Sequence, residues 1–435
     1  MTLNEKTLKV HCHAAQGFAT LKGTRRNDCV LFYDKCGMEL EVRKNMLKKL
    51  SIIIVLFVLS SMPVFVFDAR GAELRTGNYQ AHLMEAIDRS FNLDEAGADA
   101  GLKRAVEFEP DNPTGYALEA MLHMFAYEMC FSLEKRQKEK EAILYFSEEA
   151  VVRGKKRIAK NPKDSQAYVA MALAKIAKVN LVVKEKRYIA MTHETANIWS
   201  YLEAAKSCDP NNYDADFLMG LMHYHIDHFA GVTGFLSSLF ITEGDRQKGL
   251  AEIRTAAQKG YLLKEMARVE LVSVYLNYEK QPSKALPIVQ GLRNKFPDNY
   301  NFHFIYATAL LELNRFAEAE AMAAQIEKNI SGEVPPFIPQ LQPRYYQLMA
   351  RIHFKRGEYG RAESYFQKAI QDKSFYNIRT QARSLLYLGM IHDIRQERKY
   401  AQDYYKRVLK IEGADGATRI DAKGYLQTPY RVDGK

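Results

Sequence analysis

The sequence predicts an all-α fold, a right-handed α-solenoid built from helix-turn-helix repeats. Three observations support this prediction. Small residues recur at a fixed period, since Ala285 and Ala319 are 34 residues apart. Large apolar residues alternate with alanine or glycine at three- and four-residue spacings, as packed helices require. Short links that contain proline, asparagine or aspartate close several of these segments.

The composition is that of an ordinary globular chain. Of the 435 residues, 47% are hydrophobic and 26% are charged, so we expect a core that folds without disulfides or metals. Tyrosine (26) and phenylalanine (22) are abundant, whereas Trp199 is the single tryptophan. This bias fits repeat helices, in which large aromatic side chains fill the space between paired helices.

The net charge of +10 is unevenly distributed. Residues 1–45 contribute +3, residues 46–72 contribute +2, and the remainder contributes +5. The sequence contains no block of lysine and arginine interleaved with aromatics, which nucleic-acid binding would favour. We therefore expect a solvated basic face and no nucleic-acid partner.

An export signal is predicted at residues 46–72. The segment begins with Met46, Lys48 and Lys49, continues with an apolar run over 50–67, and ends in small residues. This order is typical of a secretory signal peptide, here with cleavage after Gly71. The alternative is an uncleaved membrane anchor, because the mainly apolar run of 18 residues is at the lower edge of the spanning range of about 17–25. Either interpretation places the rest of the chain outside the cytoplasm, in the periplasm or attached to the envelope.

Residues 1–45 are expected to be a disordered extension from an upstream start codon. Their cysteines, Cys12, Cys29 and Cys36, match no common zinc-binding spacing. Only Cys130 and Cys208 follow the signal. They could pair in an oxidising compartment, but two buried free thiols are preferred because they lie in separate helical regions.

The clearest repeat runs from Pro343 to about Ser374. Aromatic, apolar and small residues fall at the expected positions of two helices joined by a turn, namely Tyr346, Met349, Ala350, Gly357, Tyr359, Ala362, Phe366 and Ala369. The next segment repeats the pattern, and Ala401 follows Ala362 by 39 residues. Its matching residues are Leu385, Leu388, Gly389, Ala401, Tyr405 and Leu409.

The sequence before these units is less regular. We predict six to eight hairpins between 75 and 415, interrupted by a Gly-broken apolar insert over 229–243 and by a stiff, proline-rich linker. The predicted divisions are an irregular helical array at 73–328, the linker at 329–343, two C-terminal units at 344–412 and a tail at 413–435.

These patterns resemble the tetratricopeptide repeat superfamily over about three quarters of the chain, and with the export signal they resemble an exported bacterial member. The stretch from Phe217 to Leu313 is also similar to a eukaryotic tetratricopeptide family tied to the outer mitochondrial membrane. The resemblance implies a scaffold for protein interactions and an envelope-related role.

Motifs for catalysis are missing from the sequence. It contains no Gly-x-Ser-x-Gly, His-Glu-x-x-His, phosphate-binding glycine loop or dinucleotide fingerprint. We therefore predict a non-enzymatic protein with no cofactor. The most metal-like cluster is His223, His225, Asp227 and His228. Only His223 and Asp227 share a helix face at the i, i+4 spacing, so ordinary polar helix positions are preferred to a metal site.

A concave groove is the predicted functional site. Positions that face the groove in the superfamily correspond here to Phe304, Arg344, Gln347, Arg351, Phe354, Arg383, Leu386 and Met390, with Asn301, Thr308, Leu311 and Asp393 beside them. The three arginines could bind an acidic segment or a C-terminal carboxylate, because arginine pairs with carboxylates in bidentate fashion. A solvated basic face is the equal alternative. Two further functions stay open, a structural subunit of an envelope assembly and a protein that binds membrane or an apolar ligand through the 229–243 insert.

Overall fold

The computed structural model describes residues 79–129, 133–184, 188–233, 245–373, 377–414 and 416–432. Side chains are described for these residues except at 128–133, 182–196 and 226–244. Three parts of the sequence analysis lie outside the described residues. They are the predicted extension and export signal, Cys130, and the 229–243 insert after residue 233. Assignments made for them stay predictions.

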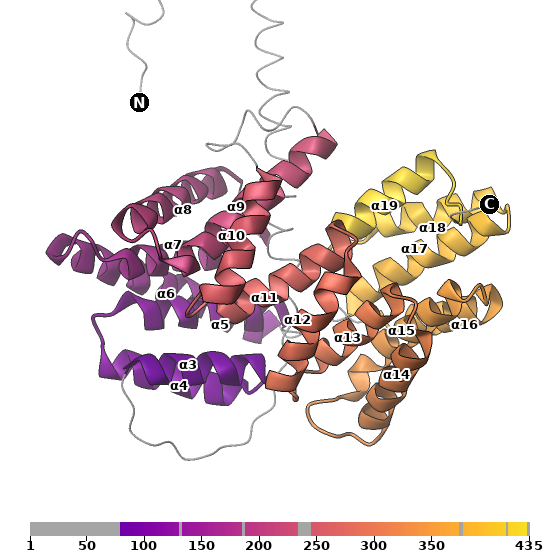
Figure 1. Ribbon diagram of the computed structural model, residues 1–435, viewed down its shortest axis with the longest axis horizontal. Helices are drawn as coiled ribbons and strands as arrows, with labels where there is room; N and C mark the ends of the chain where they lie inside the picture. Colours follow the sequence, from indigo (N-terminus) through magenta and orange to yellow (C-terminus); the bar gives the residue numbers. More distant parts are fainter. Residues whose placement is uncertain are drawn as a thin grey trace, which may run out of the picture. The chain divides into compact units, whose positions relative to one another are not determined.

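The described residues form seventeen α-helices and no strand (Figure 1), which confirms the predicted all-α class. In chain order the helices are α3 (Tyr79–Phe91), α4 (Glu95–Phe108), α5 (Pro113–Met129), α6 (Leu133–Lys160), α7 (Ser165–Lys184), α8 (Tyr188–Cys208), α9 (Tyr213–Thr233), α10 (Arg246–Lys259), α11 (Lys264–Ser273), α12 (Pro282–Lys295), α13 (Tyr300–Glu312), α14 (Phe316–Ser331), α15 (Gln342–Lys355), α16 (Tyr359–Ala369), α17 (Ile378–Ile394), α18 (Arg398–Lys410) and α19 (Gly416–Gln427). A π-helical turn, η2 (Val274–Tyr278), and a 3₁₀ turn, η3 (Pro339–Leu341), complete the described elements.

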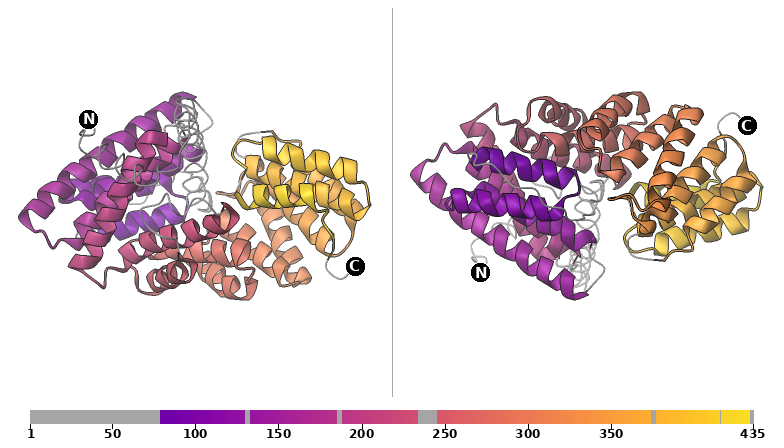
Figure 2. Two further views of the ribbon diagram at one scale, coloured as in Figure 1. Left: turned by 90° about the horizontal axis from the view of Figure 1, so that it is seen from above. Right: turned by 90° about the horizontal axis from the view of Figure 1, so that it is seen from below.

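Helices that follow one another along the chain pack as pairs, from α3 with α4 to α17 with α18. Figure 2 shows this pairing from two further sides. None of the described helices combines the length and the apolar character needed to cross a membrane.

Short polar links start the first helix of several pairs. Asn112 accepts a hydrogen bond from Thr114 N before α5, Asp164 from Ala167 N before α7, and Asn212 from Ala215 N before α9. An oxygen at the N-cap satisfies a backbone N–H that has no partner within the helix, so these residues define where each pair begins. These links lie beside Pro110, Pro162 and Pro210, in the short segments with proline, asparagine or aspartate that the sequence predicts as the ends of repeats.

The two predicted C-terminal units coincide with α15–α16 and α17–α18. Gly357 makes the turn of the first unit with φ of +77°, a conformation that favours glycine. Ala362 and Ala401 are fully buried at equivalent positions, beside the buried rings of Phe366 and Tyr405. Each such ring removed from water stabilises the fold by roughly 1.5–3 kcal/mol.

The proline-rich segment and the tail are packed against helices. The segment between α14 and α15 contains η3, and the ring of Phe337 is buried against Tyr300 and His303 of α13. Helix α15 belongs to two hydrophobic clusters, because Leu348 and Ile352 pack in the first and Ala350 and Phe354 in the second. Residues expected to leave the repeat pattern form α19, which packs on α18. The predicted domain boundaries themselves stay predictions.

Helices α9 and α10 approach each other through two glycines. A Cβ atom at Gly249 would lie 2.4 Å from the backbone nitrogen of Tyr224 and 2.7 Å from the carbonyl oxygen of Gly220. Contacts this short are with backbone atoms, which cannot rotate away. The α9–α10 pair therefore depends on the absence of a side chain at Gly249.

We predict that Gly249→Ala lowers the free energy of unfolding by about 1–3 kcal/mol, because the added methyl group forces the two helices apart. Urea-induced unfolding followed by circular dichroism measures the change. Gly291→Ala on α12 is the matched control, since a Cβ there meets no atom within 4 Å and replacing a helical glycine stabilises by about 0.5–1 kcal/mol. Equal effects of the two substitutions would contradict the packing argument.

Candidate partner-binding face

Helices α13, α15 and α17 bring together the residues predicted for the groove. Each is the first helix of its pair, and α15 contacts both α13 and α17. We call the side chains at the predicted positions on these helices the three-helix face: Asn301, Phe304, Thr308, Leu311, Arg344, Gln347, Arg351, Phe354, Arg383, Leu386, Met390 and Asp393. Helices α13, α15 and α17 are neighbours, as expected for the first helices of successive repeats.

Arg344 is held in place by α13. Its Nη1 donates to Asn301 Oδ1 at 2.5 Å, and its guanidinium carbon lies 4.3 Å from the centre of the Phe304 ring. Asn301 and Phe304 are themselves buried, so they offer a fixed support. A cation over an aromatic face is stabilised by the ring electrons. The guanidinium is therefore oriented, and Arg344 remains half-buried rather than enclosed.

Arg351 forms an ion pair between α15 and α13. Its Nη2 donates to Glu312 Oε1 at 2.8 Å and its Nη1 to Thr308 Oγ1 at 3.3 Å, while Lys355 donates to Glu312 Oε2 at 2.7 Å. Burial opposes ionisation of Glu312, but the positive charges of Arg351 and Lys355 outweigh it and lower the pKa of the carboxyl group. The Glu312 carboxylate therefore links the α13–α14 pair to the α15–α16 pair.

Most of the uncharged positions of the three-helix face hold neighbouring helices together. Gln347 is buried and its Nε2 donates to the carbonyl oxygen of Thr380 on α17 at 2.8 Å. Phe354 is 7% exposed and its ring makes an edge contact with that of Tyr387, 5.0 Å between centroids. Burial is equally deep for Phe304, Leu311, Leu386 and Met390. These side chains present little surface to a partner, and their role in binding stays a prediction. Arg344 and Arg383, which are partly exposed, supply the accessible polar surface, whereas the side chain of Arg351 is only 12% exposed.

Asp393 anchors the C-terminal helix. Its carboxylate accepts hydrogen bonds from Arg398 Nη1 at 2.9 Å, Tyr405 Oη at 2.8 Å and the backbone nitrogen of Tyr430 at 2.9 Å. Arg398 also donates to the carbonyl oxygens of Tyr425 and Leu426 at the end of α19. The chain itself therefore occupies Asp393, which sequence reasoning placed at the edge of the groove. Donors up to 37 residues away cannot be identified from local spacing.

The two histidines of the metal-like cluster whose side chains the structure describes, His223 and His225, pair with different glutamates. His223 Nδ1 lies 2.6 Å from Glu252 Oε2, and its Nε2 lies 3.4 Å from Lys248 Nζ. His225 Nε2 lies 2.9 Å from Glu270 Oε1 on α11. The side chain of Asp227 lies outside the described residues. The positive Lys248 disfavours a metal ion at Nε2 of His223. The choice between a metal site and ordinary polar positions stays a prediction.

Cys208 is a free thiol within the described residues. Its Sγ donates to the carbonyl oxygen of Pro162 at 3.3 Å. It is half-buried rather than buried as expected. Its pairing with Cys130 stays an open prediction because Cys130 lies outside the described residues.

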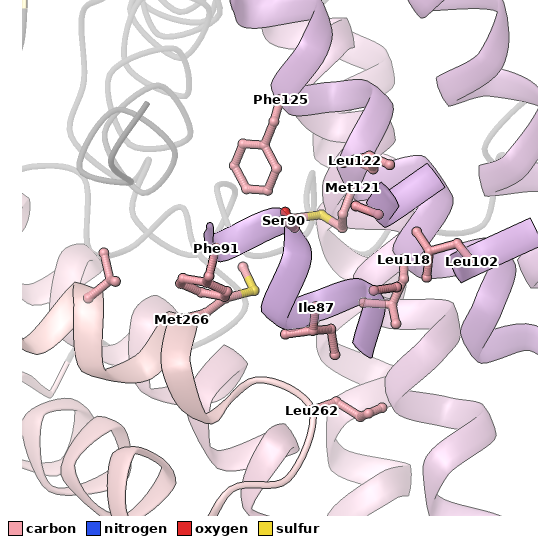
Figure 3. Close-up of a pocket in the computed structure, with 13 residues that line it drawn as sticks. Ile87, Ser90, Phe91, Leu102, Leu118, Met121, Leu122, Phe125, Leu262 and Met266 are labelled. Atoms are coloured by element: carbon pink, nitrogen blue, oxygen red, sulfur yellow. The ribbon is translucent and has the colours of Figure 1, made fainter. Parts of the chain in front are cut away.

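An apolar cavity of about 60 Å³ lies between α3, α4, α5 and α11 (Figure 3). Segments far apart in sequence form it, since Phe91 and Met266 both line it. Beside the cavity, Phe91 stacks on Phe296 with 5.1 Å between ring centroids, and Asn299 Nδ2 donates to the carbonyl oxygen of Phe91 at 2.8 Å. Its walls are lined mainly by Ile87, Phe91, Leu102, Leu118, Met121, Leu122, Phe125, Leu262 and Met266. No periodicity in the sequence indicates it, because it depends on contacts between residues more than 150 positions apart.

We predict that Glu312→Gln lowers the free energy of unfolding by about 1–3 kcal/mol at pH 7, because a charge-assisted bond between two pairs is lost. The folded-state pKa of Glu312 is below its ordinary value of 4.5, so ionised Glu312 stabilises the fold above pH 4.5 and this contribution is lost as pH falls through the lowered pKa. The difference between wild type and variant should therefore shrink below pH 4.5. Urea unfolding at several pH values measures it. Glu107→Gln, an exposed position on α4, should change little, and a difference independent of pH would contradict the ion-pair argument.

Comparison with known proteins identifies the repeat. Residues 276–352 match the sequence model described as tetratricopeptide repeat. No curated protein matches the chain. Among solved structures, a tetratricopeptide repeat protein from Parabacteroides merdae is 16% identical, covers 71% of this chain and 98% of its own, and has a TM-score of 0.29. The human IFIT1 dimer with m7Gppp-AAAA is 15% identical, with coverage of 86% and 84% and a TM-score of 0.40.

At these identities and TM-scores the likeness does not extend to what those proteins bind. The family match is more informative, because it spans α12, α13, α14 and most of α15, the helices that carry Phe304, Arg344 and Arg351. Residues 276–352 of the chain are therefore similar in sequence to the tetratricopeptide repeat.

Proposed function

We propose that this chain is a non-enzymatic scaffold that binds a protein or peptide partner along the three-helix face. Tetratricopeptide repeat proteins are generally interaction scaffolds, and a repeat match covers part of this face. The observation that supports the proposal best is the placement of Arg344 and Arg351 on α15 and of Arg383 on α17, two first helices that contact each other. An extended partner could meet the three side chains in turn.

An acidic partner fits these arginines. Asn301 and Phe304 orient the Arg344 guanidinium before any partner arrives, so less side-chain entropy is lost when it binds a carboxylate. Arg351 already forms an ion pair with Glu312, and this pair joins α13 to α15. Within the proposal, Arg344 and Arg383 contribute most to affinity, and Arg351 contributes through the architecture.

The proposal places this scaffold in the cell envelope. Support comes from residues 46–72, whose basic, apolar and small regions follow the order of an export signal. The resemblance of Phe217 to Leu313 to a membrane-associated tetratricopeptide family is consistent with this location. Cleavage after Gly71 would release the helical array into the periplasm, whereas retention would tether it to the membrane.

We predict that the double substitution Arg344→Glu and Arg383→Glu lowers recovery of the partner at least tenfold, because two charge-assisted hydrogen bonds of about 1.5–3 kcal/mol each become repulsive. Affinity purification from envelope extract with mass spectrometry measures recovery.

The matched control is Lys399→Glu with Lys406→Glu on α18, which changes the net charge by the same amount at exposed second-helix positions. The control should recover the same proteins as wild type. Equal recovery by both double variants would rule out the three-helix face as the binding surface.

We predict that the exported protein begins at Ala72, so that its mass lacks residues 46–71 when translation starts at Met46. Gly71→Phe should retain the apolar segment, because the cleavage site requires a small residue. Gly77→Phe, beyond the site, should leave cleavage unchanged. N-terminal sequencing after cell fractionation distinguishes the outcomes. A wild-type chain that keeps the segment would support an anchor, and a chain confined to the cytoplasm would contradict export.

A further inference from the structure

Three potential metal ligands converge between α4 and α5, away from the three-helix face. Glu119 and His123 are one turn apart on α5, and Asp99 projects from α4. One ligand atom from each residue lies within 4.8 Å of the other two. The i, i+4 spacing of Glu119 and His123 places both on one side of α5.

Glu119 is the unusual member of this group. The residue is fully buried, and neither carboxylate oxygen has a hydrogen-bond partner among the described residues. Buried polar groups are nearly always hydrogen-bonded, and an isolated buried carboxylate is strongly unfavourable. Its Oε2 lies 4.0 Å from Nε2 of His123, so it points toward the space that the three residues enclose. A cation in that space would supply the missing partner.

His123 is oriented as a metal-binding histidine would be. Its Nδ1 lies 2.7 Å from Glu139 Oε2 on α6, and its ring stacks on Phe146 with 5.3 Å between centroids. A proton on Nδ1 shared with this carboxylate leaves the lone pair of Nε2 directed toward Glu119. Metal-ligating histidines commonly have a carboxylate on the other ring nitrogen, which fixes the ring and raises its basicity.

The surroundings also contain competing charge. Asp99 Oδ2 accepts from Lys103 Nζ at 2.7 Å, an exposed pair within one helix. Such pairs contribute little, so a divalent cation can displace Lys103. Glu95, one turn before Asp99 on α4, and Glu139 add negative charge near the cluster, while Lys135 adds a positive charge beside Glu95. The four carboxyl groups outnumber Lys103 and Lys135. The local balance therefore favours a cation.

We propose that Asp99, Glu119 and His123 bind one divalent first-row transition metal ion, for which Zn²⁺ is the best candidate. One imidazole and two carboxylates form a mixed nitrogen and oxygen set, which suits these ions better than Mg²⁺ or Ca²⁺. Ligands around a tetrahedral zinc at bond lengths near 2.0–2.1 Å lie about 3.4 Å apart, so separations of up to 4.8 Å close through small side-chain rotations. The fourth position is left to water, and the partly exposed His123 gives access from solvent.

The bound ion would link α4 directly to α5. The contact of His123 with Glu139 already joins α5 to α6, so the ion would connect three successive helices. The site is independent of the partner-binding proposal, since no residue of the three-helix face takes part. A metal that binds only the folded chain raises its stability in proportion to the logarithm of metal concentration over Kd.

Zinc titration of the chelator-treated, purified chain tests the proposal. We expect wild type to bind one more equivalent of Zn²⁺ than Glu119→Gln, and Zn²⁺ to raise the midpoint of thermal unfolding of wild type but not that of Glu119→Gln. Glu119→Gln preserves shape and removes the buried charge, so it should fold. Asp99→Asn provides a second, half-exposed substitution, with at least a tenfold weaker affinity expected.

His392→Gln is the matched control. Its Nδ1 is also held by a glutamate, Glu397, and its Nε2 also lies 4.0 Å from a carboxylate, Glu363. Glu363, however, pairs with Arg395 at 2.8 Å, so no buried isolated carboxylate is present there. His392→Gln should bind Zn²⁺ like wild type, whereas His123→Gln should lose the additional equivalent.

Cobalt identifies the ligands. Co²⁺ bound by Asp99, Glu119 and His123 gives visible absorption without the thiolate charge-transfer bands that cysteine ligation would add. Equal Zn²⁺ equivalents and affinities in wild type, Glu119→Gln and His123→Gln would overturn the proposal. So would a folded wild type that binds no Zn²⁺, or one that binds Mg²⁺ and Ca²⁺ as tightly as Zn²⁺.

Discussion

The two helices of each pair lie close together, and the contacts between neighbouring pairs depend on this close packing. Alanine occupies the crossing points at Ala285, Ala319, Ala362 and Ala401, all fully buried. At Gly389 a Cβ atom would lie 2.4 Å from the ring of Tyr405, so the small residue and the large ring form one packing unit. Because interiors are close-packed, a larger residue at a crossing would shift both helices. Such a shift would also move the first helices that form the three-helix face.

Polar contacts between successive pairs form a second level of organisation. Arg344 reaches back to Asn301, Arg351 to Glu312, and Gln347 forward to Thr380. These contacts connect residues 33 to 43 positions apart, about one repeat, so each pair is positioned by its neighbours. The same positions were predicted to bind a partner. Arg344 and Arg351 already donate hydrogen bonds to Asn301 and Glu312, so fewer of their N–H groups remain for a ligand. We therefore expect the three arginines to contribute unequally to partner affinity.

The local parts of this fold were predictable from sequence. Helix starts followed from asparagine and aspartate caps, such as Asp164 before α7, and the crossings followed from alanines one repeat apart. The convergence of α13, α15 and α17 followed from the repeat itself. Contacts that join distant segments were not predictable, because periodicity contains no information about them. The stacking of Phe91 on Phe296, the cavity beside it and the isolation of Glu119 between α4 and α5 belong to this group. The i, i+4 spacing of Glu119 and His123 was visible, but such a pair is common on helices and gave no indication of burial.

The carboxylate of Asp393 helps to determine what covers the outer surface of the α17–α18 pair. Each pair in a repeat protein leaves an apolar surface that can accept another pair. On α18 this surface is taken by α19, which Arg398 holds through the carbonyl oxygens of Tyr425 and Leu426 while Asp393 orients Arg398. A further repeat, or a second molecule stacking end to end, would have to displace α19 and break this network. One buried aspartate thus helps to hold the helix that covers this surface of the α17–α18 pair.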